Sequence, residues 1–285
     1  MLYLNGDTDP RFSYERIIMK KIYVITGATS GIGKALTEYF AEENTVFAGY
    51  RDEKKLSGLP KSVIPFYINS TDSASIAQAA EFIQSKTDKI NTLINVAGCV
   101  VAGVMEHIST DELRRQFEVN VFAHIDLSQR LLGLLDGGRI INISSMSSFG
   151  IFPFIAPYAA SKRALDIMFN AMALEMKKNI KVISIKPGVI ATPLWEKSIK
   201  ENESAFSSCL EYDKEINFMV KNAKSNGVKG LAVEKVVEVI AKADSSKNPR
   251  PSYTVGIDAK AAELISHLPQ GVLNKIIKFK LAQKL

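Results

Sequence analysis

The stretch that decides the fold is IYVITGATSGIG, residues 22–33. An apolar strand over 22–25 runs into a glycine-rich turn, and an amphipathic helix follows at once. Glycines in such a turn let backbone N–H groups approach a pyrophosphate, and the helix N-terminus adds a favourable dipole. The glycine spacing differs from the G-x-G-x-x-G pattern, but the strand–turn–helix setting favours a dinucleotide-phosphate loop over a simple turn. The predicted phosphate-binding residues are Gly27, Thr29, Ser30, Gly31, Ile32 and Gly33.

Outward from this unit, short apolar runs alternate with longer amphipathic ones along the chain. Most of the short runs are continuously apolar, which is typical of strands buried on both faces of a parallel sheet. Such alternation predicts a doubly wound α/β fold, with a mainly parallel seven-stranded sheet and helices on both faces. The predicted strands are 22–25, 45–49, 63–68, 92–95, 139–144, 181–186 and 252–255, and the predicted helices are 32–42, 73–85, 110–135, 157–177 and 233–243.

The chain of 285 residues has no internal repeat and no linker rich in Gly, Pro or Ser. We therefore expect a single domain over residues 19–285. Charged residues interrupt any signal-peptide core in residues 1–18, so we expect either a flexible leader there or a true start at Met19. Residues 193–230 are mixed in polarity and lie between a strand and a helix, which predicts a substrate-loop insertion over one end of the sheet.

Composition excludes several classes of protein. Hydrophobic residues make up 46% and charged residues 23%, which is typical of a folded globular protein. Two cysteines and three histidines argue against a disulfide scaffold and against a Cys- or His-rich metal site, so we expect no metal. The cysteine content fits a reduced, cytoplasmic environment. A net charge of +6 favours an anionic ligand or a membrane surface but is too weak to indicate nucleic acid.

The end of the second predicted strand bears on the choice of cofactor. It reads Gly49-Tyr50-Arg51 at the point that would face the adenosine ribose, where an acidic residue would hold the 2′-hydroxyl of NAD. Tyr50 is neutral and Arg51 is basic, and a guanidinium grips a 2′-phosphate by paired, charge-assisted hydrogen bonds. We therefore predict NADP(H) in preference to NAD(H), with a solvated loop arginine as the plain alternative.

A second motif is Tyr158-Ala159-Ala160-Ser161-Lys162, at the start of a predicted helix. Residues four apart share a helix face, so Tyr158 and Lys162 are neighbours. A free tyrosine has a pKa of about 10, too high for proton transfer near neutral pH. An ammonium within about 4–6 Å favours the phenolate, so we expect Lys162 to lower the pKa of Tyr158. On its own the Tyr-x3-Lys pair is also common on surface helices.

Together these motifs resemble the short-chain dehydrogenase/reductase family of single-domain Rossmann oxidoreductases, especially its hydroxysteroid and retinol dehydrogenase-like members. The motifs fall in the family's order over about residues 20–260: TGATSGIG at 26–33, NVAG at 95–98 and VNV at 119–121. Ser145 lies 13 residues before Tyr158, which is the family's usual spacing, and Pro187-Gly188 with Thr192 resembles the segment after the sixth strand.

The resemblance implies a role for each matching residue. Tyr158 is the general acid in carbonyl reduction and the base in alcohol oxidation, while Lys162 lowers its pKa and binds the nicotinamide ribose. Ser145 hydrogen-bonds the substrate oxygen and steadies developing negative charge. Asn120 holds a water in a proton relay, and Thr192 contacts the nicotinamide carboxamide. Further cofactor contacts are implied for Asn69, Asn95, Ala97, Gly98, Pro187 and Gly188.

Two positions depart from the family's pattern. Asn69 stands where many members have Asp near the adenine, which puts cofactor affinity in doubt. Ser30 stands where some NADPH-dependent members have Lys or Arg. The preference for NADP(H) therefore rests on Arg51 without that second support.

Apolar residues indicate the kind of substrate. Aromatic and aliphatic residues crowd the segment 149–155 after the serine motif, and Trp195 opens the insertion. They predict a roomy apolar pocket under a lid, which favours a small hydrophobic carbonyl or alcohol of steroid, retinoid or acyl-lipid type. Core packing is an equal alternative for Trp195. The predicted substrate contacts are Ser145, Phe152, Tyr158 and Trp195.

Two other functions stay open at this point. The first is a 3-oxoacyl carrier-protein reductase, although the long insertion argues against the open cleft that a carrier-borne chain needs. The second, of a different class, is a dinucleotide-binding regulator without turnover. The complete Ser145, Tyr158 and Lys162 set argues against a regulator, because a sensor needs the phosphate loop but not a proton donor.

The end of the chain and the long helices bear on partners. Leu273, Ile276, Ile277 and Leu281 fall near helical spacing among lysines, which predicts a basic amphipathic helix. Such a helix can lie on an anionic membrane surface, and it can equally pack on its own domain or on a partner subunit. Members of the family usually pair through the helices that span about 110–135 and 157–177 here, so we expect a homodimer or homotetramer.

Overall fold

A computed structural model describes residues 20–203, 206 and 210–282 of the chain. It contains one parallel sheet of seven strands in the order β3-β2-β1-β4-β5-β6-β7. This order reverses direction between β1 and β4, as a doubly wound sheet requires. The predicted fold class is therefore confirmed. The strands are β1 Ile22–Ile25, β2 Thr45–Tyr50, β3 Ile64–Tyr67, β4 Thr92–Asn95, β5 Arg139–Ile143, β6 Lys181–Pro187 and β7 Ser252–Val255.

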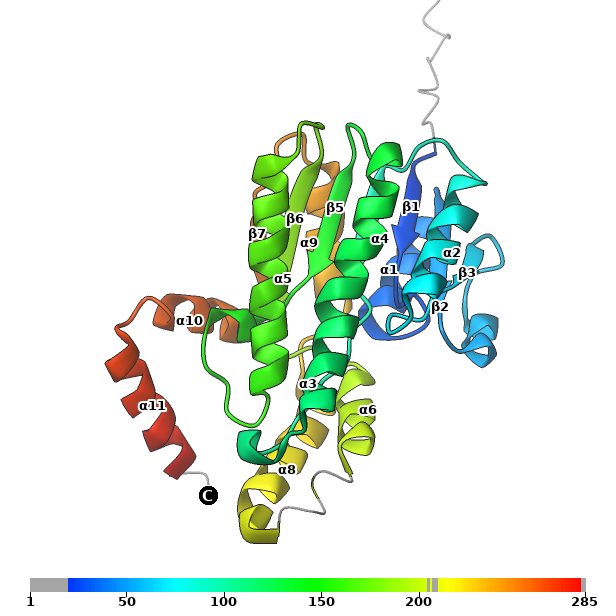
Figure 1. The fold of residues 1–285 in the computed structure, drawn as a ribbon. Coiled ribbons are helices and arrows are strands. Elements are labelled where there is room, and N and C mark those ends of the chain that lie inside the picture. Colours follow the sequence, from blue (N-terminus) through cyan, green and yellow to red (C-terminus); the bar gives the residue numbers. More distant parts are fainter. Residues whose placement is uncertain (1–19, 204–205, 207–209, 283–285) are drawn as a thin grey trace, which may run out of the picture.

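Helices cover both faces of the sheet (Figure 1). On one face α2, α4 and α5 bury Ile83, Leu127 and Phe169 against the strands. On the other face α1 and α9 bury Leu36 and Ile240. Because both faces are covered, the central strands are mainly apolar, which explains why their positions follow from the sequence. The helices are α1 Gly31–Ala41, α2 Ser73–Gln84, α3 Thr110–Phe117, α4 Ala123–Leu131, α5 Ala156–Glu175 and α9 Glu234–Ser245.

The span 110–135, predicted as one helix, is helical without interruption from 110 to 134, but it changes type along its length. Between α3 and α4 the chain forms a π-helical turn, η3, over Glu118–Phe122, and a 3-10 turn, η4, follows α4 over Leu132–Leu134. The π-helical turn holds Asn120, whose side chain is fully buried. The predicted helical span is thus confirmed, and the structure adds a π-helical turn that places Asn120 against its tertiary partners.

The span 193–230 forms helices at the carboxyl ends of the strands, the lower end in Figure 1. They are α6 Leu194–Glu201, the 3-10 turn η6 Leu210–Tyr212 and α8 Asp213–Lys229. We call the span 194–229 the lid, of which residues 204–205 and 207–209 lie outside the described part. Helix α8 packs on α6. The lid thus lies at the end of the sheet where doubly wound folds bind ligands.

Two helices follow the last strand. Helix α10 Ile257–Ile265 packs against η5, a 3-10 turn over Met146–Phe149 that comes directly after Ser145. Helix α11 Gln270–Ala282 extends away from the rest of the molecule (Figure 1), and none of its residues is buried. The predicted leader, residues 1–18, lies outside the described residues. Within the described residues, no helix has the length and apolarity to span a bilayer.

A buried carboxylate joins α9 to the amino ends of the strands. Asp244 Oδ2 accepts hydrogen bonds from the Tyr23 hydroxyl at 2.8 Å and from Lys21 Nζ at 2.9 Å. Asp244 Oδ1 accepts one from the Thr92 hydroxyl at 2.5 Å. The side chain of Asp244 is only 3% exposed, so these bonds replace its lost hydration. The network stabilises the end of the sheet opposite the lid.

Candidate active site

The predicted phosphate loop joins β1 to α1. Gly27 and Gly31 have φ values of +63° and +50°, which favour glycine. A β-carbon on Gly33 would collide with the carbonyl oxygen of Gly27, so the close turn also needs glycine there. The Ser30 side chain does not cap α1, and the first turn of the helix has no acidic residue. Amides at this helix end are therefore available to a phosphate, and the residues fit a dinucleotide.

Other predicted residues lie against this loop. A β-carbon on Gly27 would be 3.0 Å from the backbone of Ala97, and one on Gly31 would be 3.3 Å from Cβ of Thr192. The Thr26 hydroxyl accepts hydrogen bonds from the backbone amides of Val96 at 2.9 Å and Ala97 at 3.2 Å. The fold therefore brings the phosphate loop, the 95–98 segment and Thr192 together at the carboxyl ends of the strands.

Asn95 takes a different place from the one the resemblance implies. Its side chain is fully buried and donates hydrogen bonds to Asn142 Oδ1 at 2.8 Å and to Ser128 Oγ at 3.3 Å. These bonds join the carboxyl ends of β4 and β5 beneath the site. The side chain of Asn95 therefore supports the 95–98 segment from below, and its contact with a cofactor stays a prediction.

The four predicted catalytic residues converge where β4, β5 and α5 meet. Ser145 follows β5, while Tyr158 and Lys162 lie one turn apart on α5, and the Ser145 hydroxyl is close enough to Tyr158 to act on its pKa. A β-carbon on Gly98 would lie 3.5 Å from Asn120 Oδ1 and 3.8 Å from Lys162 Nζ, so these two side chains face the same spot. The arrangement can deliver a proton from Tyr158 to an oxygen bound at Ser145.

The ionisation of the pair differs from the sequence-based expectation. Burial raises the pKa of Tyr158 to about 12, and the nearby Ser145 hydroxyl only partly offsets this. Burial lowers the pKa of Lys162 to about 8, against the opposing charge of Asp166. Lys162 Nζ donates to the Ile143 carbonyl oxygen at 2.7 Å and lies 5.8 Å from the centre of the Tyr158 ring. The expected lowering of the Tyr158 pKa by Lys162 is thus not met, because the ammonium is directed to a backbone oxygen.

Asn120 is held by bonds on both ends of its carboxamide. Its Oδ1 accepts a hydrogen bond from the Cys99 amide at 2.9 Å. Its Nδ2 donates to the Cys99 carbonyl oxygen at 3.1 Å and to Ser161 Oγ at 3.1 Å. The oxygen has a second lone pair, which leaves one position for a water beside Lys162.

His124 was not predicted as part of the site. It lies four residues after Asn120, is only 2% exposed and donates from Nε2 to the Ala97 carbonyl oxygen at 2.8 Å. Burial, together with the nearby charge of Lys162, lowers the pKa of His124 to about 3. The neutral imidazole therefore fixes the 95–98 segment. The sequence does carry one signal for His124, because a residue four positions after Asn120 lies on the same helix face.

At the predicted nicotinamide end of the site, the carboxylate of Asp258, which was not predicted, holds the backbone after Pro187. The Gly188 amide donates to the Val255 carbonyl oxygen at 2.8 Å, so the chain after Pro187 stays beside β7. Asp258 Oδ2 accepts a hydrogen bond from the Val189 amide at 2.7 Å, and a β-carbon on Gly188 would collide with this carboxylate. Glycine at 188 is thus needed for the close approach of α10.

The residues predicted to select the cofactor and substrate lie around this core. Arg51 is exposed directly after β2. Asn69 Oδ1 accepts hydrogen bonds from the Thr71 amide at 3.3 Å and hydroxyl at 3.0 Å, so the amide shapes a local turn. Phe152 is half-buried in the 150–155 loop. Trp195 Nε1 donates to the Ile190 carbonyl oxygen at 2.7 Å, so the ring nitrogen of this half-buried side chain is bonded to the backbone that leads into the lid.

One group of possible metal ligands lies at the edge of the lid. Among the described residues, ligand atoms of Glu106, His107 and Glu211 all lie within 4.8 Å of one another, and all three side chains are exposed. His107 Nε2 is 3.3 Å from Glu211 Oε1. The group therefore joins the loop after β4 to the lid by a hydrogen bond.

The chain matches a known protein family and two characterised relatives. The family model for short chain dehydrogenase matches residues 21–203. The chain is 31% identical over 271 residues to the NADPH-dependent 3-dehydrocapnine reductase of Ornithobacterium rhinotracheale, which covers 89% of this chain and 94% of that protein. It is 34% identical over 200 residues to a 3-oxoacyl-[acyl-carrier-protein] reductase of Thermotoga maritima, which covers 66% of this chain and 81% of that protein.

Solved structures show the same architecture. A short chain dehydrogenase from Burkholderia cenocepacia, solved in complex with NADP, superposes with a TM-score of 0.69 and 25% sequence identity. The superposition covers 90% of this chain and 96% of that one. The likeness therefore extends beyond the matched segment of the family model into the C-terminal part of the fold.

Proposed function

This chain belongs to the short-chain dehydrogenase family and is an NAD(P)-dependent oxidoreductase acting on alcohol and carbonyl groups, and we propose that it uses NADPH to reduce a lipophilic ketone or aldehyde. The reverse oxidation of the alcohol is part of the proposal. The observation that carries it is the convergence of Ser145, Tyr158, Lys162 and Asn120 beside the phosphate loop. Simple nucleotide binding would not require this set of proton-transfer groups.

The cofactor would supply the hydride, and the protein would supply the proton. The Tyr158 hydroxyl donates its proton to the carbonyl oxygen, which the Ser145 hydroxyl holds in place. A raised pKa keeps Tyr158 protonated, as the acid in a reduction must be. Lys162 binds the nicotinamide ribose, and Asn120 holds a water that returns a proton towards Tyr158. Glycines 27, 31 and 33 let the pyrophosphate approach the amino end of α1.

Preference for NADPH over NADH is supported by Arg51. The side chain is exposed at the carboxyl end of β2, the strand end that faces the adenosine ribose in this fold. A guanidinium there can pair with a 2′-phosphate. The NADPH dependence of the Ornithobacterium relative and the NADP bound in the Burkholderia structure agree with this assignment.

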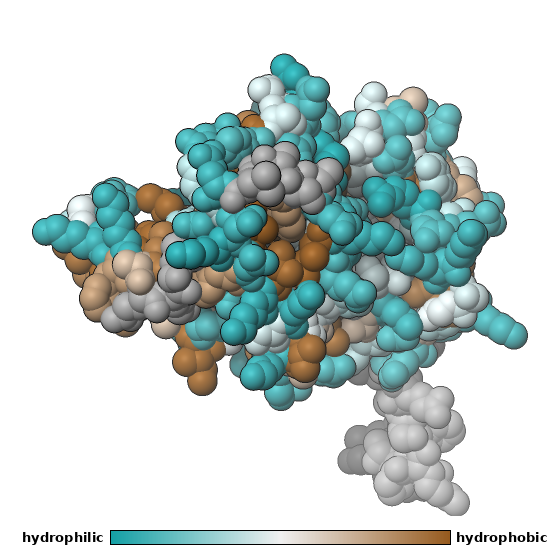
Figure 2. Space-filling model, turned by 90° about the horizontal axis from the view of Figure 1, so that it is seen from below, coloured by the Kyte–Doolittle hydropathy of each residue, from teal (hydrophilic) through white to brown (hydrophobic). Residues whose placement is uncertain are grey.

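A lipophilic substrate is supported by the surface around the site. Viewed from the carboxyl ends of the strands, apolar side chains gather near the centre of the face and hydrophilic ones surround them (Figure 2). The half-buried Phe152 and Trp195 belong to the two segments, the 150–155 loop and the lid, that flank the catalytic residues. Apolar lining favours a hydrophobic carbonyl compound over a sugar.

A carrier-bound acyl substrate is the second candidate, because the Thermotoga relative reduces a 3-oxoacyl-[acyl-carrier-protein]. The experiment that separates the candidates measures NADPH consumption with ketosteroids, retinal, long-chain ketones and 3-oxoacyl thioesters, with NADH in parallel. Turnover of a free lipophilic carbonyl supports the proposal, and turnover of the thioesters alone supports the second candidate. Tyr158→Phe should abolish turnover while NADPH still binds. Binding without turnover of any compound by the unaltered protein would instead indicate a regulator.

We also propose a cytoplasmic homodimer or homotetramer that pairs through α3, α4 and α5. Helix α5 carries exposed apolar residues that suit such contact, with Ile167 at 56%, Met168 at 42% and Leu174 at 89% exposure. Sedimentation at micromolar concentration tests this assembly, and a monomer would contradict it.

A further inference from the structure

The backbone segment directly after the 95–98 motif is held almost entirely by side chains. We call Cys99–Gly103 the strap. Its residues form no regular secondary structure, and residues 99–103 are all buried. Buried backbone amides and carbonyls need hydrogen-bond partners. In the strap, side-chain carboxamides provide most of them.

The bonds on one edge of the strap come from the α3–η3 segment. Asn120 bonds both the amide and the carbonyl of Cys99, at 2.9 and 3.1 Å. Gln116 Oε1 accepts from the Val101 amide at 2.6 Å, and Gln116 Nε2 donates to the Cys99 carbonyl oxygen at 3.0 Å. Both side chains have no exposed surface. The proposed catalytic Asn120 is therefore positioned by the strap and not by its own helix alone.

The bonds on the other edge come from the lid. Asn202 directly follows α6 and is 1% exposed. Its Oδ1 accepts from the Ala102 amide at 3.0 Å, and its Nδ2 donates to the Val100 carbonyl oxygen at 2.8 Å. The same Nδ2 donates to the Ser198 carbonyl oxygen at 2.7 Å within the lid. A single side chain thus joins the end of α6 to the strap.

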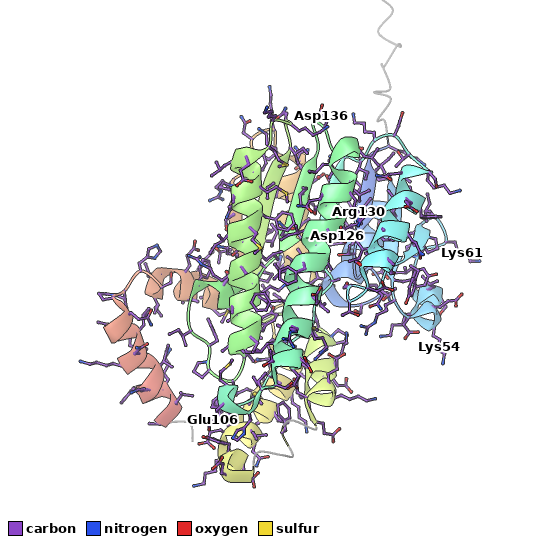
Figure 3. All side chains as sticks on the ribbon, in the orientation of Figure 1. Lys54, Lys61, Glu106, Asp126, Arg130 and Asp136 are labelled. Atoms are coloured by element: carbon purple, nitrogen blue, oxygen red, sulfur yellow. The ribbon has the colours of Figure 1, made fainter. Side chains whose placement is uncertain are left out.

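Two further contacts place the strap between the lid and the rest of the site. The Gly103 amide donates to the Phe154 carbonyl oxygen at 2.8 Å, and Phe154 has an unfavourable φ of 67°. Beyond the strap, Glu106 accepts a hydrogen bond from the Tyr212 hydroxyl, and Glu106 lies close to α8 (Figure 3). The strap therefore contacts the lid, the 150–155 loop and the element that carries Asn120.

We propose that Asn202 is a positioning residue that couples the lid to Asn120 through the strap. The inference rests on the proposed function, since it concerns the residues that perform it. Asn120 and Asn202 grip opposite edges of one short segment, so displacement of α6 shifts the Cys99 backbone and with it the carboxamide of Asn120. Gly98, the residue before the strap, lies beside both Asn120 and Lys162. The position of α6 and the placement of the proton-transfer groups are therefore coupled.

The test compares Asn202→Asp with Asn217→Asp. Asn202→Asp replaces the Nδ2 group, which donates to two carbonyl oxygens, by a carboxylate oxygen that repels them. Asn217→Asp makes the same chemical change at an exposed position of α8. We expect kcat to fall about tenfold or more in the first variant, with the KM for NADPH unchanged, and to stay unchanged in the second. Asn202→Ala serves if the aspartate variant does not fold.

A second readout needs no substrate. Cys99 lies in the strap, is 4% exposed and has a thiol pKa raised by burial, so alkylation requires the strap to open. Peptide mapping should show alkylation of Cys99 about tenfold faster in Asn202→Asp than in Asn217→Asp, at a temperature well below unfolding of either. Unchanged labelling, or a lower melting temperature with unchanged kcat, would overturn the coupling. If the unaltered protein turns over no substrate, the proposed function fails while the labelling still tests the strap.

Discussion

The ammonium nitrogen of Lys186 lies 3.3 Å from Oδ2 of Asp166, and the two side chains are only 11% and 3% exposed. This ion pair joins β6 to α5 one helical turn beyond Lys162. The same ammonium lies 4.6 Å from the centre of the Phe149 ring, in the turn that follows Ser145. A buried pair of this kind is costly to break, because the remaining charge loses its partner.

Asp166→Asn should therefore act on both stability and pH dependence. We expect unfolding free energy to fall by about 3–5 kcal/mol, as for other buried pairs left with one partner. The charge of Asp166 raises the pKa of Lys162, which is about 8 in the unaltered protein. Removing this charge should therefore lower the Lys162 pKa. The alkaline decline of kcat should then begin at a lower pH. Urea unfolding and a pH–rate profile measure the two effects.

A surface pair provides the matched control. On α4, Arg130 Nε lies 2.6 Å from Asp126 Oδ1 (Figure 3), and the side chains of Asp126 and Arg130 are 30% and 41% exposed. Solvent-exposed pairs contribute about 0–1 kcal/mol. Asp126→Asn should leave both the unfolding free energy and the pH profile close to those of the unaltered protein. Equal losses in the two variants would contradict the special role of the buried pair.

Arg51→Asp should change the choice between cofactors. The substitution removes the guanidinium proposed to pair with the 2′-phosphate and places a carboxylate where it repels that phosphate and can bind a ribose hydroxyl. We expect kcat/KM for NADPH to fall about 100-fold and that for NADH to rise, with little change in kcat. Steady-state kinetics with both cofactors measure the ratio. An unchanged ratio would show that Arg51 is a solvated loop residue.

His124 should make the protein sensitive to mild acid. Its pKa falls from 6.5 to about 3 on folding, so between these values the unfolded chain binds a proton that the folded chain does not. Stability then rises with pH in this window and is lost as the pH falls through it. From pH 7 to pH 5 the loss from this residue should be about 2 kcal/mol.

Two variants isolate the contribution of His124. His124→Gln keeps a side-chain donor for the Ala97 carbonyl oxygen and removes the titration, so its urea midpoint should fall less between pH 7 and pH 5. His267→Gln removes an exposed histidine and should retain the full acid loss. The same pH dependence in both variants would assign the acid sensitivity to other groups.

Helix α11 should bind anionic membranes. Its sequence has no acidic residue, Lys275, Lys278 and Lys280 are exposed, and no apolar residue of the helix is buried against the fold. Each lysine near an anionic surface is worth about 1 kcal/mol, so replacing all three by Gln should weaken binding about 100-fold. Vesicle flotation with and without residues 270–285 measures this. Flotation with neutral vesicles is the control, and equal recovery of intact and truncated chains would instead favour packing on a partner subunit.

Much of the fold could be predicted because its cause is local. The strands over 22–25 and 92–95 have the predicted limits, since burial on both faces favours a mainly apolar run. The span 110–135 is helical as predicted, but the π-helical turn at Asn120 could not be predicted. The carboxamide of Asn120 bonds Cys99, a residue distant in sequence, and periodicity carries no information about such a bond.

The site divides in the same way. Tyr158 and Lys162 can be placed together from sequence because helical spacing makes them neighbours. The direction of the Lys162 ammonium depends on the Ile143 carbonyl at the end of β5, so its effect on Tyr158 could not be predicted. Asn202 and Gln116 belong to no motif or periodic pattern, so the sequence does not indicate their part in the site. A carboxamide shows its importance only when the fold buries it against a particular stretch of backbone.

The buried carboxylate of Asp244 stabilises the sheet at the end opposite the lid. It is joined to Tyr23 and Thr92 at the amino ends of β1 and β4, while the catalytic groups and the lid lie beyond the carboxyl ends. Architecture of this kind lets an enzyme acquire new substrates in evolution. Mutations that reshape the lid leave the anchoring end intact, so a lineage can explore specificity without first losing its folded state.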